Sequence, residues 1–196
     1  MNKLNVGFAL CGSFCTFRQA INTMKDIKSD GHNIIPIMSY NAYATDTRFG
    51  KAKNFRDEIE DICRNDIISS IENAEPIGPK KLLDILIILP CTGNTLAKIA
   101  NSIADTPVTL ACKSHLRNAR PVLIGVSTND ALAGAAKNIG ALMNMKNYYF
   151  VPLRQDDYVS KTTSIVADFD KTKDAMYSAI ESRQLQPMIT EILQFN

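Results

Sequence analysis

Short apolar segments alternate with longer amphipathic segments along most of this chain. The apolar segments predict strands at residues 4–10, 34–38, 83–89, 122–126 and 148–153. They are continuous runs, which is typical of strands buried on both faces. The intervening segments predict helices at residues 13–29, 54–63, 66–73, 94–104, 108–116, 130–145 and 170–185. Alternating strands and helices indicate an α/β fold with a doubly wound parallel sheet, in three layers α/β/α. We expect one domain that spans residues 1–196.

Composition excludes several classes of function. The chain is 45% hydrophobic and 21% charged, which argues against disorder. A net charge of +2 gives no reason to expect a nucleic-acid or membrane partner. The first residues lack a cleavage site for a signal peptide, so we expect a cytoplasmic protein.

The cysteines and histidines do not form a recognisable metal motif. Five cysteines are present, an odd number, and none form a C-x-x-C pair. We therefore expect free thiols, with neither a disulfide framework nor a metal site. For Cys11, Cys15 and Cys91, packing as small buried thiols is favoured over a nucleophilic role. His32 lies in a predicted helix-to-strand turn and is expected at the surface.

In parallel sheets, ligands bind beyond the carboxyl ends of the strands. Gly12 and Ser13 follow the first strand, where a glycine allows close backbone approach and a helix start suits a phosphate. A simple helix cap at Ser13 is the alternative. The G-x-G-x-x-G fingerprint of dinucleotide-binding folds is absent. Ser39 and Asn41 follow the second strand, either as turn residues or as ligands.

Small and polar residues follow the third predicted strand: Pro90, Cys91, Thr92, Gly93, Asn94 and Thr95. We expect Pro90 to end the strand, because proline has no N–H for the ladder. Gly93 leaves room for a flat ligand, and Asn94 can both donate to and accept from a heteroaromatic ring edge. Thr95 is the expected helix cap, and Lys98 can face an anion. The alternative is a capped helix with a solvated lysine.

The fourth predicted strand ends in Ser127, Thr128 and Asn129, which would face the same edge. Asp130 is in position to cap the following helix. No serine–histidine–aspartate, cysteine–histidine or paired-carboxylate arrangement stands out, so no catalytic residue is assigned.

The segments CGSFCTFRQA, MSYNA, PCTGNTLAKIANSIADTPVT and RPVLIGVSTND resemble, in order and spacing, the FMN-binding cysteine-decarboxylase-like flavoprotein family. The resemblance implies a Rossmann-like fold, with the flavin ring against the small residues after the third strand and its phosphate at the Gly12–Ser13 turn. It implies FMN contacts from Gly12, Ser13, Phe14, Ser39, Asn41, Pro90, Cys91, Thr92, Gly93, Asn94, Thr95 and Thr109.

The chain departs from the family pattern in three features. Of the family's Pro-Ala-Met-Asn motif, only Asn129 is kept. When the chain is placed in register with the family's motifs, Pro76 occupies the position of the family's catalytic histidine. The cysteine loop of the family's decarboxylases is also missing. Family decarboxylation is therefore not the expected activity.

A second set of segments, TDTRFG, AEPIGPK, PCTGN, RNARPVLIGVSTNDALA, QDD and LQPM, resembles a sporulation branch of the same family. The resemblance implies an oxidoreductase subunit in the mother-cell cytoplasm, with a partner protein similar to an NADP-dependent dehydrogenase. It also implies homo-oligomers, as trimers or multiples of trimers. The implied reaction oxidises a small dihydropyridine dicarboxylate, and a non-catalytic flavin-binding role in assembly is the alternative.

A dicarboxylate needs hydrogen-bond donors and cations. Hydroxyls at Ser127 and Thr128, with Asn129, suit a polar anionic ring. Arg48, in the long polar loop after the second strand, has a planar guanidinium that matches a carboxylate. We expect these four residues to bind the substrate. For Arg48, the alternative is a solvated loop cation.

Overall fold

The computed structural model describes residues 3–190 and is built around a mostly parallel sheet. Within this range the sheet has seven strands in the order β2-β1-β3-β4-β7-β6, with β5 paired to β4. The strands are β1 (Asn5–Leu10), β2 (Asn33–Met38), β3 (Ile85–Cys91), β4 (Val122–Thr128), β5 (Tyr148–Phe150), β6 (Leu153–Arg154) and β7 (Ile165–Ala167). Strands β1 to β5 pair in parallel, whereas β7 is antiparallel to both β4 and β6. The predicted α/β class is confirmed.

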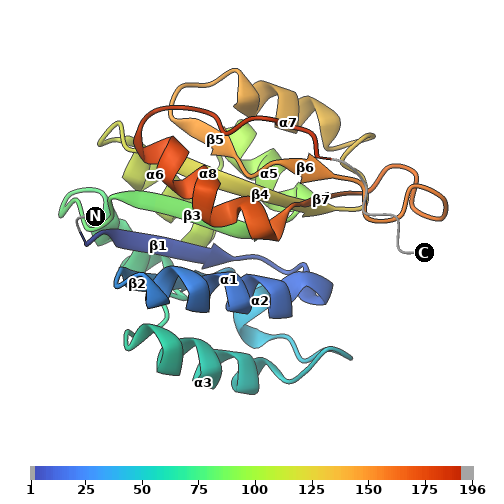
Figure 1. Ribbon diagram of the computed structural model, residues 1–196. Helices are drawn as coiled ribbons and strands as arrows, with labels where there is room; N and C mark the ends of the chain where they lie inside the picture. The colour runs from blue at the N-terminus through green and yellow to red at the C-terminus, as the bar shows by residue number, and fades with distance from the viewer. Residues whose placement is uncertain (1–2, 191–196) are drawn as a thin grey trace.

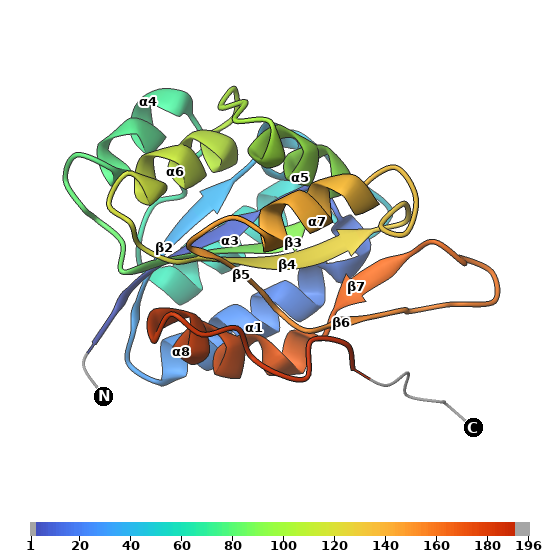
Figure 2. The same cartoon turned by 90° about the horizontal axis from the view of Figure 1, so that it is seen from above.

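Helices cover both faces of this sheet (Figures 1 and 2). The α-helices are α1 (Phe17–Ser29), α2 (Tyr40–Ala44), α3 (Ala52–Cys63), α4 (Ile71–Ala74), α5 (Gly93–Ala100), α6 (Pro107–Leu116), α7 (Ala136–Met143) and α8 (Thr172–Ile180). Short 3₁₀ turns are η1 (Phe14–Thr16), η2 (Glu75–Ile77) and η3 (Phe169–Lys171). Figure 2 shows α4 to α7 on one side of the sheet and α1 and α8 on the other. The chain therefore has the three expected layers.

The strands are buried on both faces because their side chains alternate between two cores. In β1, Phe8 and Leu10 pack into the core beneath α1, α3 and α8. Their neighbour Ala9 packs into the core on the other side, with Leu96 of α5 and Val108 of α6. This alternation explains why the strands are continuous apolar runs in the sequence.

Strand β3 does not end at Pro90, as the sequence predicted, but continues to Cys91. The register shifts between Ile88 and Cys91, so Pro90 sits at an irregularity where no ladder N–H is required. The Pro90 carbonyl still accepts from the Cys11 amide, at 3.2 Å.

Several predicted helices are shorter than their sequence patterns, and backbone hydrogen bonds explain why two of them begin late. The segment before α4 is extended, because Ile68 pairs with β2: its carbonyl accepts from Met38 and its amide donates to Pro36. Helix α7 begins at Ala136 rather than at residue 130, because the Asp130 carbonyl accepts from two amides of an intervening turn.

His32 is buried rather than exposed, with 3% of its surface accessible. Its Nδ1 accepts from the Leu4 amide at 3.3 Å, and its Nε2 lies 2.9 Å from the Tyr177 hydroxyl. Helix α8 covers the turn in which His32 lies, a long-range contact that the local sequence does not indicate.

His115 in α6 is fully buried. Its Nε2 lies 3.0 Å from the Pro121 carbonyl oxygen, and its Nδ1 has no hydrogen-bond partner among the described residues. Burial lowers the pKa of His115 from 6.5 to about 4, although the Pro121 contact acts to raise it. The side chain is therefore neutral at ordinary pH.

Across residues 3–190, no helix combines the length and apolar character that crossing a membrane requires. In the same range no three histidine, cysteine or acidic side chains gather as a metal-binding group.

Candidate functional site

Two adjoining hollows lie at the carboxyl edge of the parallel strands. The first, here called the Arg48 hollow, has a volume of about 430 Å³. The second, called the α5 hollow, has a volume of about 350 Å³ and lies beside the start of α5. Gly12 and Thr92 line both of them. One elongated ligand can therefore reach from one hollow into the other.

Most of the sequence-predicted site residues line these hollows. In the Arg48 hollow these are Gly12, Ser13, Phe14, Arg48, Thr92, Ser127, Thr128 and Asn129. In the α5 hollow they are Gly12, Ser39, Asn41, Thr92, Asn94 and Thr95. The expectation that four strand ends meet at one edge follows from the parallel topology.

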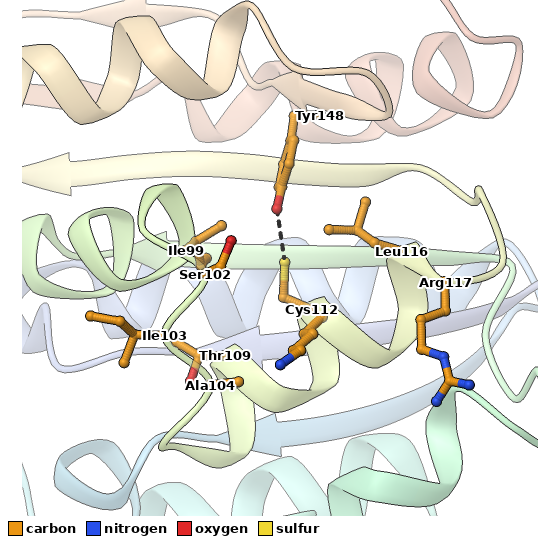
Figure 3. Close-up of a pocket in the computed structure, with 10 residues that line it drawn as sticks. Ile99, Ser102, Ile103, Ala104, Thr109, Cys112, Leu116, Arg117 and Tyr148 are labelled. Carbon is orange, nitrogen blue, oxygen red and sulfur yellow. Dashed lines mark hydrogen bonds between the residues drawn. The ribbon is translucent and has the colours of Figure 1, made fainter.

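Four of the expected cofactor contacts line neither hollow: Pro90, Cys91, Gly93 and Thr109. Pro90 and Cys91 are buried inside β3. The Thr109 hydroxyl instead lies 2.8 Å from that of Thr106, where the two threonines cap α6. Thr109 also lines a separate groove with Cys112 and Tyr148 (Figure 3).

Gly93 makes room for protein side chains rather than for a ring. A Cβ at this position would lie 2.8 Å from Asp130 Oδ1 and 2.9 Å from Thr128 Oγ1. The Thr128 hydroxyl donates to the same Asp130 oxygen at 2.6 Å. Asp130 therefore forms a hydrogen bond at the end of β4. The prediction that it caps the following helix is wrong, because α7 begins only at Ala136.

The start of α5 is open toward the α5 hollow. Thr92 is the N-cap of α5, since its hydroxyl oxygen accepts from the Thr95 amide. The sequence predicted Thr95 as the cap, but the Thr95 hydroxyl instead donates to Cys11 Sγ at 3.3 Å. The amides of Gly93 and Asn94 have no hydrogen-bond partner among the described residues. A helix start with such amides favours an anion.

Two further polar groups line the α5 hollow. The Ser39 hydroxyl oxygen accepts from the Ala42 amide at 3.3 Å, which leaves its proton available to a ligand. Lys98 Nζ lies 2.9 Å from both carboxylate oxygens of Asp105, so this lysine already has an anionic partner in the protein. No acidic side chain of the described residues lines this hollow.

Hydroxyl groups join the ends of β1 and β4 inside the Arg48 hollow. Ser13 Oγ lies 2.8 Å from Ser127 Oγ, and the Thr16 hydroxyl donates to the Ser13 carbonyl at 2.9 Å. The Ser13 side chain makes no capping hydrogen bond, because the chain enters the η1 turn before α1 begins. The simple-cap interpretation of Ser13 is therefore wrong.

Arg48 lies at the tip of a tight turn, in which Thr47 and Gly50 exchange backbone hydrogen bonds. Its guanidinium stacks on the ring of Phe49, 4.9 Å from the centroid, and no ion pair engages it in the described residues. Apolar side chains of Phe14, Phe49, Ile165 and Val166 also line this hollow.

Sequence analysis missed Asp156 and Lys161, which also line the Arg48 hollow. Both lie on the loop between β6 and β7. The QDD segment marked this region, but the antiparallel β6–β7 pairing that brings the loop to the edge of the sheet has no clear sequence pattern. Strands of two and three residues are too short to show one.

Two of the cysteines near the strand ends, Cys11 and Cys91, are poor nucleophiles. Burial raises the pKa of Cys11 to about 11, and burial also raises that of Cys91 well above its ordinary value. The expectation of a buried thiol is wrong for Cys15, which is exposed and lines the Arg48 hollow.

The chain matches the flavoprotein family over residues 1–181. It is 40% identical to the B-type subunit of dipicolinate synthase from Bacillus subtilis (strain 168), over 97% of this chain and 96% of that protein. The crystal structure of the B-type dipicolinate synthase subunit from Bacillus halodurans C matches with a TM-score of 0.89 at 38% identity, over 97% of this chain and 99% of that one. The FMN-dependent cysteine decarboxylase SpaF has the same fold, with a TM-score of 0.65 at 21% identity, over 91% of this chain and 95% of that one. The chain therefore belongs to the flavoprotein family.

Proposed function

We propose that this protein is the FMN-binding subunit of a dipicolinate synthase. With an NADP-dependent, dehydrogenase-like partner chain of the same synthase, it would oxidise dihydrodipicolinate to dipicolinate in the mother cell of a sporulating bacterium. The observation that carries this proposal is the pair of joined hollows: one has the donors that a phosphate needs, and the other has an unpaired arginine beside apolar walls.

The residues of the α5 hollow fit the phosphate of FMN. The Asn94 amide and the Ser39 hydroxyl can both donate to it, and no acidic side chain of the described residues lines this hollow. The partial positive charge at the start of α5 adds to this preference. We therefore assign the phosphate to the α5 hollow rather than to Ser13.

The Arg48 hollow fits the flavin ring together with the substrate. Phe14, Phe49, Ile165 and Val166 supply apolar surface, and the hydroxyls of Ser13 and Ser127 supply polar contacts. A substrate that exchanges electrons with a ring must touch it, so the ring and Arg48 belong in the same hollow. A phosphate at Ser13 would compete with the dicarboxylate for that space.

A bound flavin would supply a two-electron acceptor next to the substrate. Converting a dihydropyridine into a pyridine removes two electrons and two protons from the ring. Arg48 would bind one carboxylate through its planar guanidinium. Thr128 and Asn129 would orient the polar ring, and the apolar walls would exclude water from it.

Decarboxylation by the family mechanism is not favoured. The chain has only two histidines, His32 and His115, and both are buried away from the two hollows. Pro76, at the position of the family's histidine, lies in η2 and lines neither hollow. A non-catalytic, flavin-binding assembly role is the second candidate, and substrate-dependent reduction of the flavin distinguishes it.

Comparing FMN with riboflavin tests the assignment of the phosphate, since the two ligands differ only there. A hydrogen bond to a charged group contributes about 1.5–3 kcal/mol. Ser39→Ala should therefore weaken FMN binding at least about tenfold and leave riboflavin binding unchanged. Ser13→Ala is the matched control and should affect both ligands equally. If Ser13→Ala alone weakened FMN binding selectively, the phosphate would instead lie at Ser13, after β1.

We also propose that the chain forms a homo-oligomer, a trimer or a multiple of trimers. A groove of about 300 Å³ between α6 and the α5–α6 connection offers apolar surface at Ile99, Ile103 and Leu116 (Figure 3). Ile103 is 48% exposed in the single chain. Light scattering should give a mass above that of one chain, and Ile103→Lys should lower it. A monomer at all concentrations would contradict the proposal.

A further inference from the structure

The β6–β7 loop, residues 155–164, is fixed against the end of β4. The Thr163 hydroxyl donates to the Asn129 carbonyl at 2.7 Å, and the Leu132 amide donates to the Thr163 carbonyl at 3.0 Å. Gln155 Nε2 donates across the loop to the Thr162 carbonyl at 2.9 Å. These bonds hold one side of the Arg48 hollow next to the expected substrate residues.

A turn inside this loop sets the position of Lys161. The Ser160 amide donates to Asp157 Oδ1 at 2.9 Å, and the Lys161 amide donates to the Asp157 carbonyl at 2.9 Å. The Lys161 side chain lines the hollow, where its Nζ lies 3.2 Å from Asp156 Oδ2. The backbone of Lys161 is thus held while its ammonium group stays at the mouth of the hollow.

The Lys161–Asp156 ion pair is one that a ligand can replace. The two side chains are 51% and 34% exposed, and exposed ion pairs contribute little to stability. A carboxylate that enters the hollow can accept from the same ammonium group at small cost. Lys161 therefore remains available to a second anion.

Two cations from different loops line this hollow: Arg48, from the turn between α2 and α3, and Lys161, from the β6–β7 loop. A ligand with one carboxylate needs only one of them. A small ring with two carboxylates can use both, and it would leave Asp156 as the unpaired charge.

We propose that Lys161 binds the second carboxylate of the substrate and thereby selects dicarboxylates over monocarboxylates. This inference rests on the proposed function. It assigns Arg48 to one carboxylate and Lys161 to the other, with Asp156 as the group that holds the ammonium until the substrate arrives.

The test measures binding of two pyridine acids to the FMN-loaded protein by titration calorimetry. Pyridine-2,6-dicarboxylate is the product, and pyridine-2-carboxylate is the same ring with one carboxylate. Lys161→Gln should weaken binding of the dicarboxylate roughly tenfold and change that of the monocarboxylate much less. Lys137→Gln removes an exposed lysine outside the hollow and controls for net charge; it should leave both affinities unchanged.

Asp156→Asn separates carboxylate binding from a merely structural ion pair, because it breaks the same pair as Lys161→Gln. If the pair only holds the loop, the two variants weaken dicarboxylate binding alike. If Lys161 binds a carboxylate, Asp156→Asn frees the ammonium group and removes a like charge from the hollow. Its dicarboxylate affinity should then equal or exceed that of the wild type.

The remaining outcomes separate this inference from the proposed function. If the wild type prefers the dicarboxylate and Lys161→Gln keeps that preference, only the role of Lys161 is overturned. If the FMN-loaded wild type binds neither acid, the dicarboxylate site itself fails, and the proposed function fails with it.

Discussion

Acidification should destabilise this protein through His115. The side chain is fully buried, and protonation would give Nδ1 a proton with no acceptor among the described residues. Burial is the main reason why the pKa of His115 falls to about 4; the nearby Arg120 lowers it further, while the Pro121 carbonyl and Asp84 act to raise it.

The sign and size of the effect follow from linkage. The pKa is lower in the folded chain than in the unfolded chain, so this contribution to stability is fully present above pH 6.5. It is lost as the pH falls from 6.5 to about 4, because only the unfolded chain takes up the proton. At about 1.4 kcal/mol per pH unit, the total loss from this one side chain is about 3 kcal/mol.

Urea unfolding at a series of pH values, compared between wild type and His115→Gln, isolates this contribution. Glutamine keeps an N–H donor that can reach the Pro121 carbonyl, but it does not titrate. The wild type should lose about 3 kcal/mol more than the variant between pH 7 and pH 4. Parallel stability curves for the two proteins would refute the reasoning.

Three further substitutions test the site. Gly93→Ala should lower the free energy of unfolding by about 1–3 kcal/mol, because its Cβ would meet Asp130 and Thr128. Gly140→Ala is the matched control and should not destabilise the protein, because an added Cβ there would meet no other part of the described structure. Asn94→Leu should weaken FMN binding by about 1–3 kcal/mol, because the Asn94 side chain lines the α5 hollow proposed for the phosphate and leucine removes its amide donor. An unchanged affinity in flavin-fluorescence titration would exclude a contact between this side chain and the cofactor. Arg48→Ala should raise the Michaelis constant of the two-component enzyme while FMN affinity stays the same; unaltered kinetics would remove Arg48 from the dicarboxylate site.

The strands and their parallel order could be predicted because burial on both faces leaves a continuous apolar run in the sequence. The position of the two hollows at the strand ends could also be predicted, since parallel topology alone brings residues such as Ser39, Asn94 and Ser127 to one edge. Both are consequences of the fold class and need no detail of packing.

The features that could not be predicted from the sequence depend on contacts between residues far apart in the chain. Gly93 was expected to make room for a flavin ring, but Asp130, from a distant loop, fills that space. His32 is buried because α8 packs over its turn. Lys161 was missed because the position of its loop depends on an antiparallel pairing with no local pattern.

The central claim is that FMN on this chain takes part in oxidising a dicarboxylate bound beside it. The most direct measurement mixes the FMN-loaded protein with dihydrodipicolinate, without oxygen and without the dehydrogenase-like partner, and follows the visible flavin absorbance. We predict that the absorbance is lost as dipicolinate forms, in an amount that matches the bound flavin. An unchanged flavin spectrum, while the partner with NADP oxidises the same substrate on its own, would contradict the claim.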